Sequence, residues 1–554
     1  AVVGRDLFTD EMRETLSQFE QAKNFGSLIV PKLRDPAETR RLVQAQHFDG
    51  DLLLKEVQER VLAVLHMAEE LSSKYHIVVA NPPYAGAKGL NERLVSFAKE
   101  AYPDSKSDLF AMFMERCLEL LCPNGHMGML NLPSWMFLSS FERLRISLLT
   151  QAFFSSLVHC GRGLFGSDFG TVAFCMEKNP SKDERSGVFR RLFEKHVDVR
   201  KPDVIEGLFR QGDYGRYSAS TKDFQKVPGS PIVYWTSSEF LACFAEQETL
   251  ERVAEPRQGM ATSDVGRFLR LWFEVSNDNS MFDAGSREAA KSSGRRWFPT
   301  NKGGGFRKWF GNNDYLVNWQ DDGREILGYA ADLYGSPTRT IKNISYYFRP
   351  SVTWGMVTSS SFSARVSPGG HLFDVGGPSA FPRDELILPI AAFLNSSVFQ
   401  KIITTINPTM NFNSGDLAKA PFKAGLADDT HAVSCIDTLV EAHRSDWDAY
   451  ETSWNFTKLP LLSPDYRFDS LEASYARLRA HWESKTDKVK ALEEENNRIF
   501  IDAYGLEDEL TPEVPIEEIT LTCNPAYRYG VKGTEEERET RLRADTMAEF
   551  LSYA

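Results

Sequence analysis

Four consecutive residues, Asn81-Pro82-Pro83-Tyr84, combine the side chains and the backbone rigidity that chemistry on an aromatic amine requires. The lone pair of an exocyclic amine is delocalised into its ring, and two acceptors aimed at the amine hydrogens favour a pyramidal, nucleophilic nitrogen. The Asn81 side-chain oxygen and the Pro82 carbonyl can supply these acceptors, and the prolines hold them in place. The face of Tyr84 offers a surface for a flipped base. A sulfonium methyl donor, S-adenosylmethionine, would then need no metal and no covalent intermediate.

The residues before this motif place it at the end of a strand. His76-Ile77-Val78-Val79-Ala80 is a short, β-branched, apolar run, which predicts a buried parallel strand. The motif would then form a rigid loop at the carboxyl end of that strand, where ligands bind in doubly wound sheets. A proline turn that follows a strand and has no chemical role is the alternative.

Helical and strand-like segments alternate around the motif. Residues 108–121 favour a helix, because Leu109, Phe113 and Cys117 share one face and Ser107 or Asp108 can cap it. Further helices are expected at 8–25, 51–75 and 141–150, and further strands at 126–132, 154–159 and 171–176. This alternation predicts an α/β fold with a doubly wound sheet.

The rest of the chain changes character twice. Residues 181–235 are irregular, and we interpret them as a connector. Residues 236–425 are rich in Gly, Ser, aromatic residues and Arg with short β-like runs, which indicates a mixed α+β domain. Helical patterns dominate residues 426–554, and near-heptad spacing over about 470–503 predicts a packed bundle or an antiparallel coiled coil.

Residues 161–166, Gly-Arg-Gly-Leu-Phe-Gly, match the G-x-G-x-x-G pattern of a nucleotide-binding loop and follow a predicted strand. Such a loop must open a helix, because the helix N-terminus helps to hold the ligand. Here Ser167-Asp168-Phe169-Gly170 leads into another predicted strand. A plain strand connection is therefore favoured, and a glycine loop in a permuted enzyme is the alternative.

A basic and aromatic segment follows later in the chain. Between Arg287 and Lys308 seven residues are basic, and Glu288 is the one acid. Aromatic residues are interleaved with them, and three glycines at 303–305 give access to the backbone. This combination suits phosphate positioning and base contact, and a solvated charged loop is the alternative. The residues expected to bind DNA are Arg295, Arg296, Lys302, Arg307, Lys308 and Trp309.

In their order, these segments resemble an amino-methyltransferase domain. Asn81 to Tyr84 resembles its motif IV, Ser107-Asp108-Leu109-Phe110 its motif V, and residues 164–173 its motif VIII. Segments 306–311, 349–355 and 407–412 narrow the resemblance, over essentially the whole chain, to the PglX methyltransferases of BREX phage-defence systems.

The resemblance implies the second half of a Rossmann-like methyltransferase sheet in residues 1–180 and a DNA target-recognition domain in residues 236–425. It implies N6-adenine methylation of host duplex DNA by base flipping, with S-adenosyl-L-methionine as cofactor and other BREX proteins as partners. Phe165 would stack on the flipped adenine opposite Tyr84. The cofactor would lie near Asn81, Asp108, Phe110 and Phe113.

One departure from this family pattern concerns the cofactor. Methyltransferases with this motif order place a glycine-rich loop before motif IV, but residues 1–80 contain only Gly4, Gly26 and Gly50. The sequence also begins with Ala1. We therefore expect the main cofactor loop to lie upstream of this segment.

Composition limits the other functions. A net charge of −13 argues against a general nucleic-acid coat. The sequence contains no apolar run of about 18 residues, so no membrane span is expected. Seven scattered cysteines form no metal-binding pattern, so reduced thiols in a cytoplasmic protein are expected, with no metal site. A phage-encoded, negatively charged DNA mimic could occupy the same basic face.

Other functions remain alternatives at this point. Asn-Pro-Pro-Tyr also serves enzymes that methylate a glutamine side-chain amide, although the large region after the motif argues against that substrate. Methylation of cytosine N4 is a weaker alternative, because the enzymes with that target usually have Ser in place of Asn81. A DNA-recognition or scaffold subunit of a defence complex, which needs no catalysis, fits the missing glycine loop.

Overall fold

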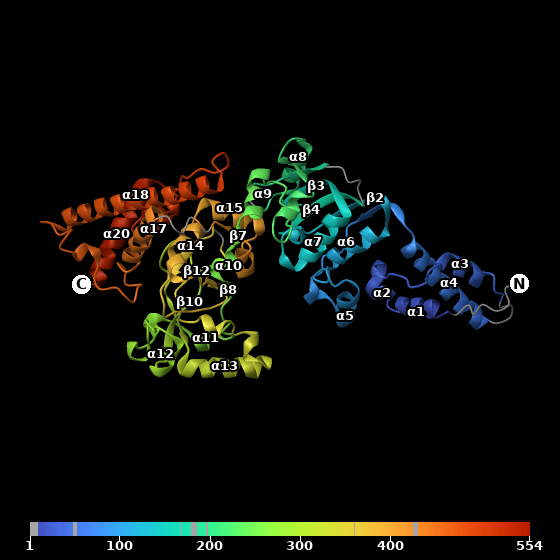
Figure 1. Cartoon of the computed structure of the whole chain (residues 1–554), viewed down its shortest axis with the longest axis horizontal. Coiled ribbons are helices and arrows are strands. Elements are labelled where there is room, and N and C mark those ends of the chain that lie inside the picture. Colours follow the sequence, from blue (N-terminus) through green and yellow to red (C-terminus); the bar gives the residue numbers. More distant parts are fainter. Residues whose placement is uncertain are drawn as a thin grey trace. The chain divides into compact units, whose positions relative to one another are not determined.

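The computed structural model describes residues 9–47, 52–166, 168–178, 185–194, 198–358, 361–423, 425 and 430–553. The chain divides into two compact units, Ala1–Ser237 and Ser238–Ala554, here called the N-terminal and C-terminal units (Figure 1). The predicted α+β and helical regions, 236–425 and 426–554, fall together into the C-terminal unit.

The N-terminal unit contains a six-stranded mixed sheet in the order β1-β2-β4-β3-β5-β6. Its strands are β1 (Tyr75–Ala80), β2 (Leu121–Asn131), β3 (Ala152–Arg162), β4 (Gly170–Lys178), β5 (Ser186–Arg191) and β6 (Arg216–Ser220). β1 is parallel to β2 and β3 is parallel to β5, while the other neighbours are antiparallel. All four expected strands are present. The sheet continues into residues 181–235 with β5 and β6, so the prediction of an irregular connector there is wrong.

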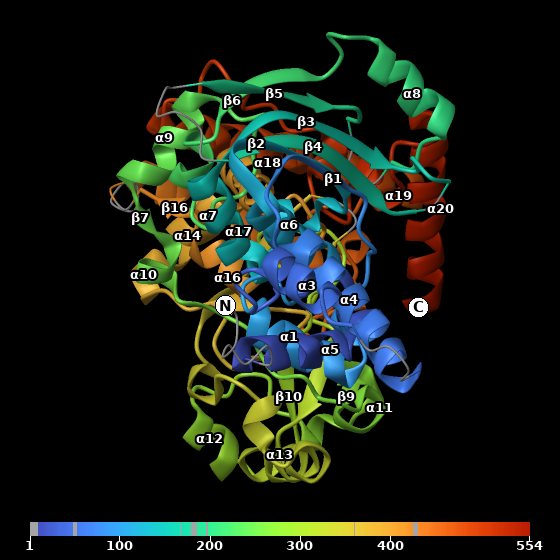
Figure 2. The ribbon, with the colours of Figure 1, turned by 90° about the vertical axis from the view of Figure 1, so that its right-hand side faces the viewer.

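Helices cover one face of this sheet. α6 (Leu109–Leu120) and α7 (Glu142–Gln151) pack against the strands on the same side (Figure 2). The apolar side chains that point to this side are fully buried, among them Met127, Phe154 and Met176. Buried Arg116 of α6 donates hydrogen bonds to the carbonyls of Ser27, Ile29 and Leu71, so the preceding helical segment is tied to the sheet.

That preceding segment is helical, as the sequence predicted. It consists of α1 (Asp10–Phe19), α2 (Ala22–Phe25), α3 (Pro36–Gln44) and α4 (Leu52–Ser72), and α5 (Glu92–Ala101) follows the motif. Met12 and Leu65 bring α1 and α4 together in a small apolar cluster. The predicted helices at 8–25 and 51–75 are thus confirmed within the described residues.

β1 departs from expectation because it lies at the edge of the sheet. It pairs in parallel with β2, as predicted, with Val79 opposite Gly128. It is not buried, however, because Ile77 is 68% exposed and Val79 78% exposed. Their side of the sheet is an open apolar groove of about 490 Å³, which continues to Asn81. α8 (Pro202–Arg210) packs on the sheet through Ile205 and Leu208, and its Phe209 lines the same groove.

The C-terminal unit contains two four-stranded sheets, β14-β10-β11-β9 and β13-β12-β15-β8. The strands are short: β8 (Pro256–Arg257), β9 (Leu269–Leu271), β10 (Trp297–Asn301), β11 (Tyr315–Asn318), β12 (Ser351–Trp354), β13 (Ala364–Ser367), β14 (Leu372–Phe373) and β15 (Ser379–Ala380). A buried aromatic core that includes Phe298, Trp319 and Phe348 packs between the first sheet and α13 (Gln320–Tyr334).

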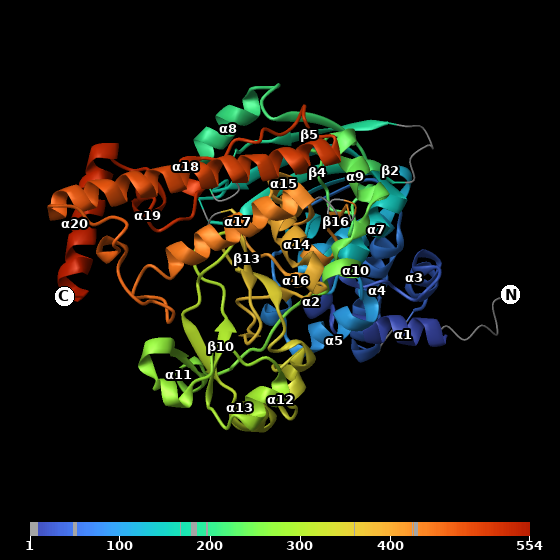
Figure 3. The same cartoon turned by 60° about the vertical axis from the view of Figure 1, so that its left-hand side comes forward.

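Helices complete this unit. The predicted helix near 470–503 is α18 (Leu471–Tyr504), which packs against α17 (Thr430–Trp447) and α15 (Ser397–Ile406), as a helical bundle would (Figure 3). The Ser470 hydroxyl caps it and Gly505, with φ of +64°, ends it. Further elements are α9 (Ser238–Glu246), α10 (Leu250–Ala254), α11 (Val265–Phe268), α12 (Arg287–Ser292), α14 (Ile387–Leu394), α16 (Ser414–Ala418), α19 (Pro525–Tyr529), α20 (Glu535–Tyr553), β7 (Glu248–Thr249) and β16 (Pro421–Phe422).

Candidate functional site

The Asn-Pro-Pro-Tyr motif leaves the carboxyl end of β1 directly, as predicted. Asn81 is exposed, Pro82 is buried and Tyr84 is half-buried. Because β1 and β2 are parallel, the motif lies beside the end of β2 at Leu130 and Asn131. The buried proline anchors the loop, while the Asn81 side chain stays open to a ligand.

A hydrogen bond joins the two ends of the motif. The Tyr84 hydroxyl lies 3.2 Å from Asn81 Oδ1 and 3.4 Å from the carbonyl oxygen of Leu130, so its one proton can be donated to either acceptor, and the shorter contact is to Asn81. Burial raises the pKa of Tyr84, so the hydroxyl keeps its proton at neutral pH. Asn81 Oδ1 is thereby held as an acceptor.

Asp108 fixes the loop that follows the motif. Its Oδ1 accepts the backbone N–H of Ala85 at 3.0 Å and that of Phe110 at 3.4 Å, so it caps α6, as predicted, and holds the loop at once. Two backbone hydrogen bonds, from Leu109 to Ala85 and from Ala87 to Ser107, reinforce the junction. Burial raises the pKa of Asp108, although these N–H groups oppose the shift. The structure thus gives Asp108 a role in positioning the loop, and contact with a cofactor stays a prediction.

The two phenylalanines expected near the cofactor lie in packed surroundings. Phe110 has no exposed surface, and its ring contacts Tyr84 edge-on at 6.3 Å and Phe141 at 5.8 Å. In this arrangement Phe110 supports Tyr84 from behind, and its contact with a cofactor stays a prediction. Phe113 is half-buried and packs beside Tyr102 and Met112, so its cofactor role stays a prediction.

The loop between β3 and β4 adds two aromatic rings. Phe165, the predicted second stacking residue, is 55% exposed. Phe169 lies between it and the motif, with ring centroids 5.9 Å from Tyr84 and 6.5 Å from Phe165. The sequence motifs do not point to Phe169, and its only signal is an aromatic residue four positions after Phe165.

The G-x-G-x-x-G segment connects two strands. Its glycines occupy the end of β3 and a turn, and the chain continues into β4, not into a helix. Gly163 has φ of +105°, and a Cβ there would lie 1.9 Å from the Arg200 carbonyl oxygen, so close backbone approach explains this glycine. The strand-connection interpretation is confirmed, with Ser167 outside the described residues.

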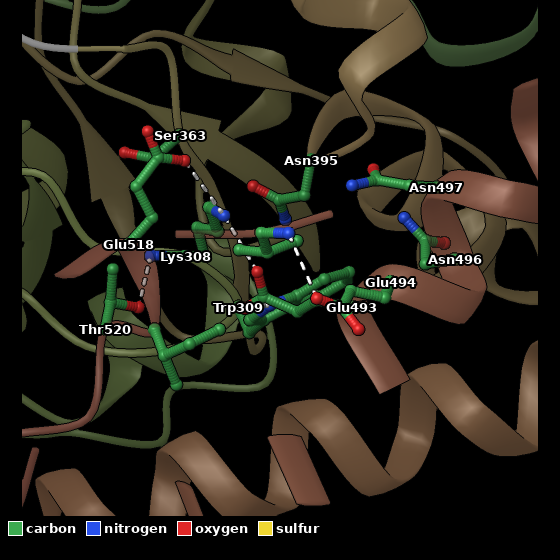
Figure 4. A network of polar contacts seen from close by, with 12 residues as sticks. Lys308, Trp309, Ser363, Asn395, Glu493, Glu494, Asn496, Asn497, Glu518 and Thr520 are labelled. Atoms are coloured by element: carbon green, nitrogen blue, oxygen red, sulfur yellow. Dashed lines mark hydrogen bonds and ion pairs between the residues drawn. The ribbon is translucent and has the colours of Figure 1, made fainter. Parts of the chain in front are cut away.

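Half of the predicted DNA-binding set is buried in the C-terminal unit. Arg307 pairs with Asp446 at 2.9 Å, and Lys308 pairs with Glu493 at 2.7 Å. The Trp309 indole donates to the second Glu493 oxygen at 2.8 Å (Figure 4). Buried and neutralised groups cannot reach phosphates, so these three residues do not belong to a DNA-facing surface in this structure. They join the glycine-containing loop to α17 and α18.

The other three predicted residues are at least partly exposed. Arg296 lies 3.5 Å from Glu325 and over the Trp297 ring, and Lys302 lies 3.5 Å from Asp374. Arg295 is half-exposed. The exposed Arg296–Glu325 pair is weak at this length, so Arg296 can exchange its partner for a phosphate, whereas the partner of Lys302, Asp374, is buried. A DNA contact there stays a prediction.

The described residues fit one side of a methyl-transfer site. Asn81, Pro82 and Tyr84 suit a planar base that carries an amine. Of the residues predicted to lie near a sulfonium nucleoside, Phe110 is buried and Asp108 Oδ1 accepts a backbone N–H group. Among the described residues no group of three or more His, Cys, Asp or Glu side chains is placed to hold a metal ion.

Within the same ranges, no single helix has the length and apolar character to cross a membrane. Two consecutive segments, Asp384–Leu394 and Ser397–Ile406, meet these criteria only as a pair bent by 77°.

The fold and this site are those of an amino-methyltransferase, and comparison with known proteins agrees with this class. Residues 9–165 match the family model of the Eco57I restriction-modification methylase. Over its length the chain is related to adenine-specific methyltransferases, which confirms the resemblance to PglX. It is 35% identical over 554 residues to the adenine-specific methyltransferase BrxX of Escherichia coli O9:H4 (strain HS), covering 98% of this chain and 43% of that protein.

A second relative is the adenine-specific methyltransferase PglX of Lacticaseibacillus casei (strain Zhang), with 32% identity over 546 residues, 94% of this chain and 44% of that protein. The chain thus spans less than half the length of these curated relatives. Among solved structures, the Type IIL restriction-modification enzyme MmeI in complex with DNA aligns with a TM-score of 0.45 and 11% identity, over 91% of this chain and 75% of that one.

Proposed function

We propose that this chain supplies the target-amine side of a DNA adenine-N6 methyltransferase. The observation that carries the proposal is the rigid Asn81-Pro82-Pro83-Tyr84 loop, which presents the Asn81 oxygen at the carboxyl end of β1. The names of the relatives, adenine-specific methyltransferases, agree with adenine as the base.

In this proposal the chain's residues hold and activate a flipped adenine. The base stacks on Tyr84, with Phe165 closing the opposite side. One N6 hydrogen is donated to Asn81 Oδ1 and the other to the Pro82 carbonyl, which leaves the nitrogen lone pair free to attack. S-adenosyl-L-methionine is the proposed methyl donor.

Duplex DNA is the proposed substrate, and the C-terminal unit is the proposed recognition region. Arg295, Arg296 and Lys302 provide exposed or half-exposed cations there. Other BREX proteins are the proposed partners, and a phage DNA mimic would compete with DNA for the same cations.

Transfer of labelled methyl from S-adenosylmethionine to duplex DNA by the full-length protein tests this function, with N6-methyladenine as the expected product. Asn81→Ala should lower the rate by about 10²–10³-fold, as loss of one precisely aimed polar group does. Asn124→Gly is the matched control, because Asn124 is exposed with φ of +60° at the opposite end of β2 and glycine suits that conformation. Unchanged adenine methylation by the Asn81→Ala variant would exclude the proposal.

The alternative is a DNA-recognition or scaffold subunit of a defence complex, which acts without catalysis. In that case Asn81→Ala would leave both DNA binding and phage restriction unchanged, and wild-type protein would transfer no methyl group.

A further inference from the structure

The Tyr84 hydroxyl makes a contact that base stacking does not require. A phenylalanine ring offers the same face to a base, yet here the phenol oxygen lies 3.2 Å from Asn81 Oδ1. Its second neighbour, the Leu130 carbonyl at 3.4 Å, belongs to β2 and is fixed by the sheet. The hydroxyl therefore lies between the exposed amide and a rigid backbone acceptor.

A carboxamide has an acceptor end and a donor end, and only one of them suits an amine substrate. If the Asn81 NH₂ group faced the target amine, two donors would meet and the amine would not be activated. The Tyr84 hydroxyl can donate its proton to the oxygen end at 3.2 Å, whereas against the NH₂ end it would have to donate to the Leu130 carbonyl at 3.4 Å and act as an acceptor. The shorter contact favours the oxygen end. The carbonyl oxygen has two lone pairs, so it can accept from Tyr84 and from a substrate amine together.

Tyr84 is itself held firmly enough to act as such a guide. Its ring is packed edge-on against Phe110 at 6.3 Å and against Phe169 at 5.9 Å. Phe110 is fully buried on α6, whose first turn is tied by Asp108 to the backbone at Ala85. A ring fixed on two sides places its hydroxyl in a narrow region.

We propose that the Tyr84 hydroxyl is a positioning group that orients the Asn81 carboxamide with its oxygen toward the target amine. This role is separate from stacking, and it rests on the function proposed above.

The Tyr84→Phe variant of the full-length protein separates the two roles, because it keeps the ring and removes the hydroxyl. We expect kcat for adenine methylation to fall about two- to tenfold, the range that one net hydrogen bond supplies. The KM for DNA and the fluorescence of 2-aminopurine at the target position, which reports flipping, should stay at wild-type values. Tyr84→Ala should instead change all three quantities.

The Tyr84→Phe substitution in a second variant, Asn81→Asp, tests whether the hydroxyl acts by orienting the carboxamide. The Asn81→Asp variant offers two equivalent oxygens and has no wrong end, so adding Tyr84→Phe to it should change kcat less than twofold. The kcat of the single Tyr84→Phe variant decides the matter: a value equal to wild type would overturn the positioning role and leave the proposed function intact. Absence of DNA methylation by the wild-type protein would instead reject the proposed function.

Discussion

Lys308 and Glu493 form a buried ion pair between residues 185 positions apart, with Nζ 2.7 Å from Oε2 and side chains that are 7% and 3% exposed. The other Glu493 oxygen accepts the Trp309 indole N–H at 2.8 Å. Trp309 has φ of +67°, a conformation that costs energy for a large side chain and persists only where its surroundings enforce it. One carboxylate on α18 therefore fixes two consecutive residues of the loop that follows the glycines.

Removing this carboxylate should destabilise the C-terminal unit strongly. Glu493→Gln leaves the Lys308 charge buried without its main counter-ion, and such losses cost about 3–5 kcal/mol. Denaturant unfolding of the full-length protein measures the change. The control is Glu495→Gln, which breaks the exposed Glu495–Arg498 pair and should cost less than about 1 kcal/mol. Equal effects of the two variants would contradict the buried role.

Mild acid should weaken the fold through two buried histidines. Burial lowers the pKa of His443 to about 3 and that of His371 to about 4, from the ordinary 6.5. Below pH 6.5 the unfolded chain takes up protons that the folded chain excludes, so stability falls as the pH drops from 6.5 toward these values. The free energy of unfolding, measured between pH 7.5 and pH 4.5, should decline, and His443→Gln should reduce the slope. A slope unaffected by His443→Gln would show that this residue does not contribute.

Asp108 should matter for methyl transfer more than for stability. Asp108→Ala removes a helix cap and also the acceptor of the Ala85 N–H, so the motif loop loses its anchor. We expect a loss of about 1 kcal/mol in stability, typical of a cap, and a fall in kcat beyond it. Asp108→Asn, which keeps an acceptor oxygen, should recover most of the activity.

Asn91 offers a matched control for that experiment. Its side chain caps α5 by accepting the Leu94 N–H at 2.9 Å, away from the Asn81–Tyr84 motif. Asn91→Ala should cost similar stability and leave kcat unchanged. Similar losses of kcat in both alanine variants would reduce the Asp108 effect to simple destabilisation.

DNA binding should depend on the exposed cations and not on the buried ones. Arg295→Ala and Arg296→Ala should each weaken binding to all DNA sequences alike and lower the salt slope by about one, as loss of a phosphate contact does. Arg498→Ala on α18 is the control, because this arginine is also exposed and paired. Titration of labelled duplex at several salt concentrations gives both quantities. An unchanged slope in the Arg295 and Arg296 variants would remove them from the interface.

The parts of the site that depend on neighbouring residues could be predicted from the sequence. The wrong predictions concern residues whose partners are distant in the sequence. The strand, the proline loop and the Asp108 cap depend on neighbours in sequence, so β1, the motif and α6 could be predicted. The burial of Arg307 and Lys308 could not be predicted, because the carboxylates that pair with them belong to Asp446 and Glu493. In the sequence, a basic segment with one acid of its own looks available to bind phosphates. In the structure, acids from later helices pair with two of its basic residues.

The prediction that β1 is buried is wrong for a related reason. An apolar run predicts a strand, but what covers the strand is a property of the remaining fold. Phe169 was missed because its contact with Tyr84 requires the hairpin of β3 and β4 to bring the loop back to the motif.

Within the described residues β1 pairs on one side only, with β2, so the backbone groups of its other edge are available to a further strand. A parallel strand added there would end beside Asn81, at the edge of the sheet where ligands bind in doubly wound folds.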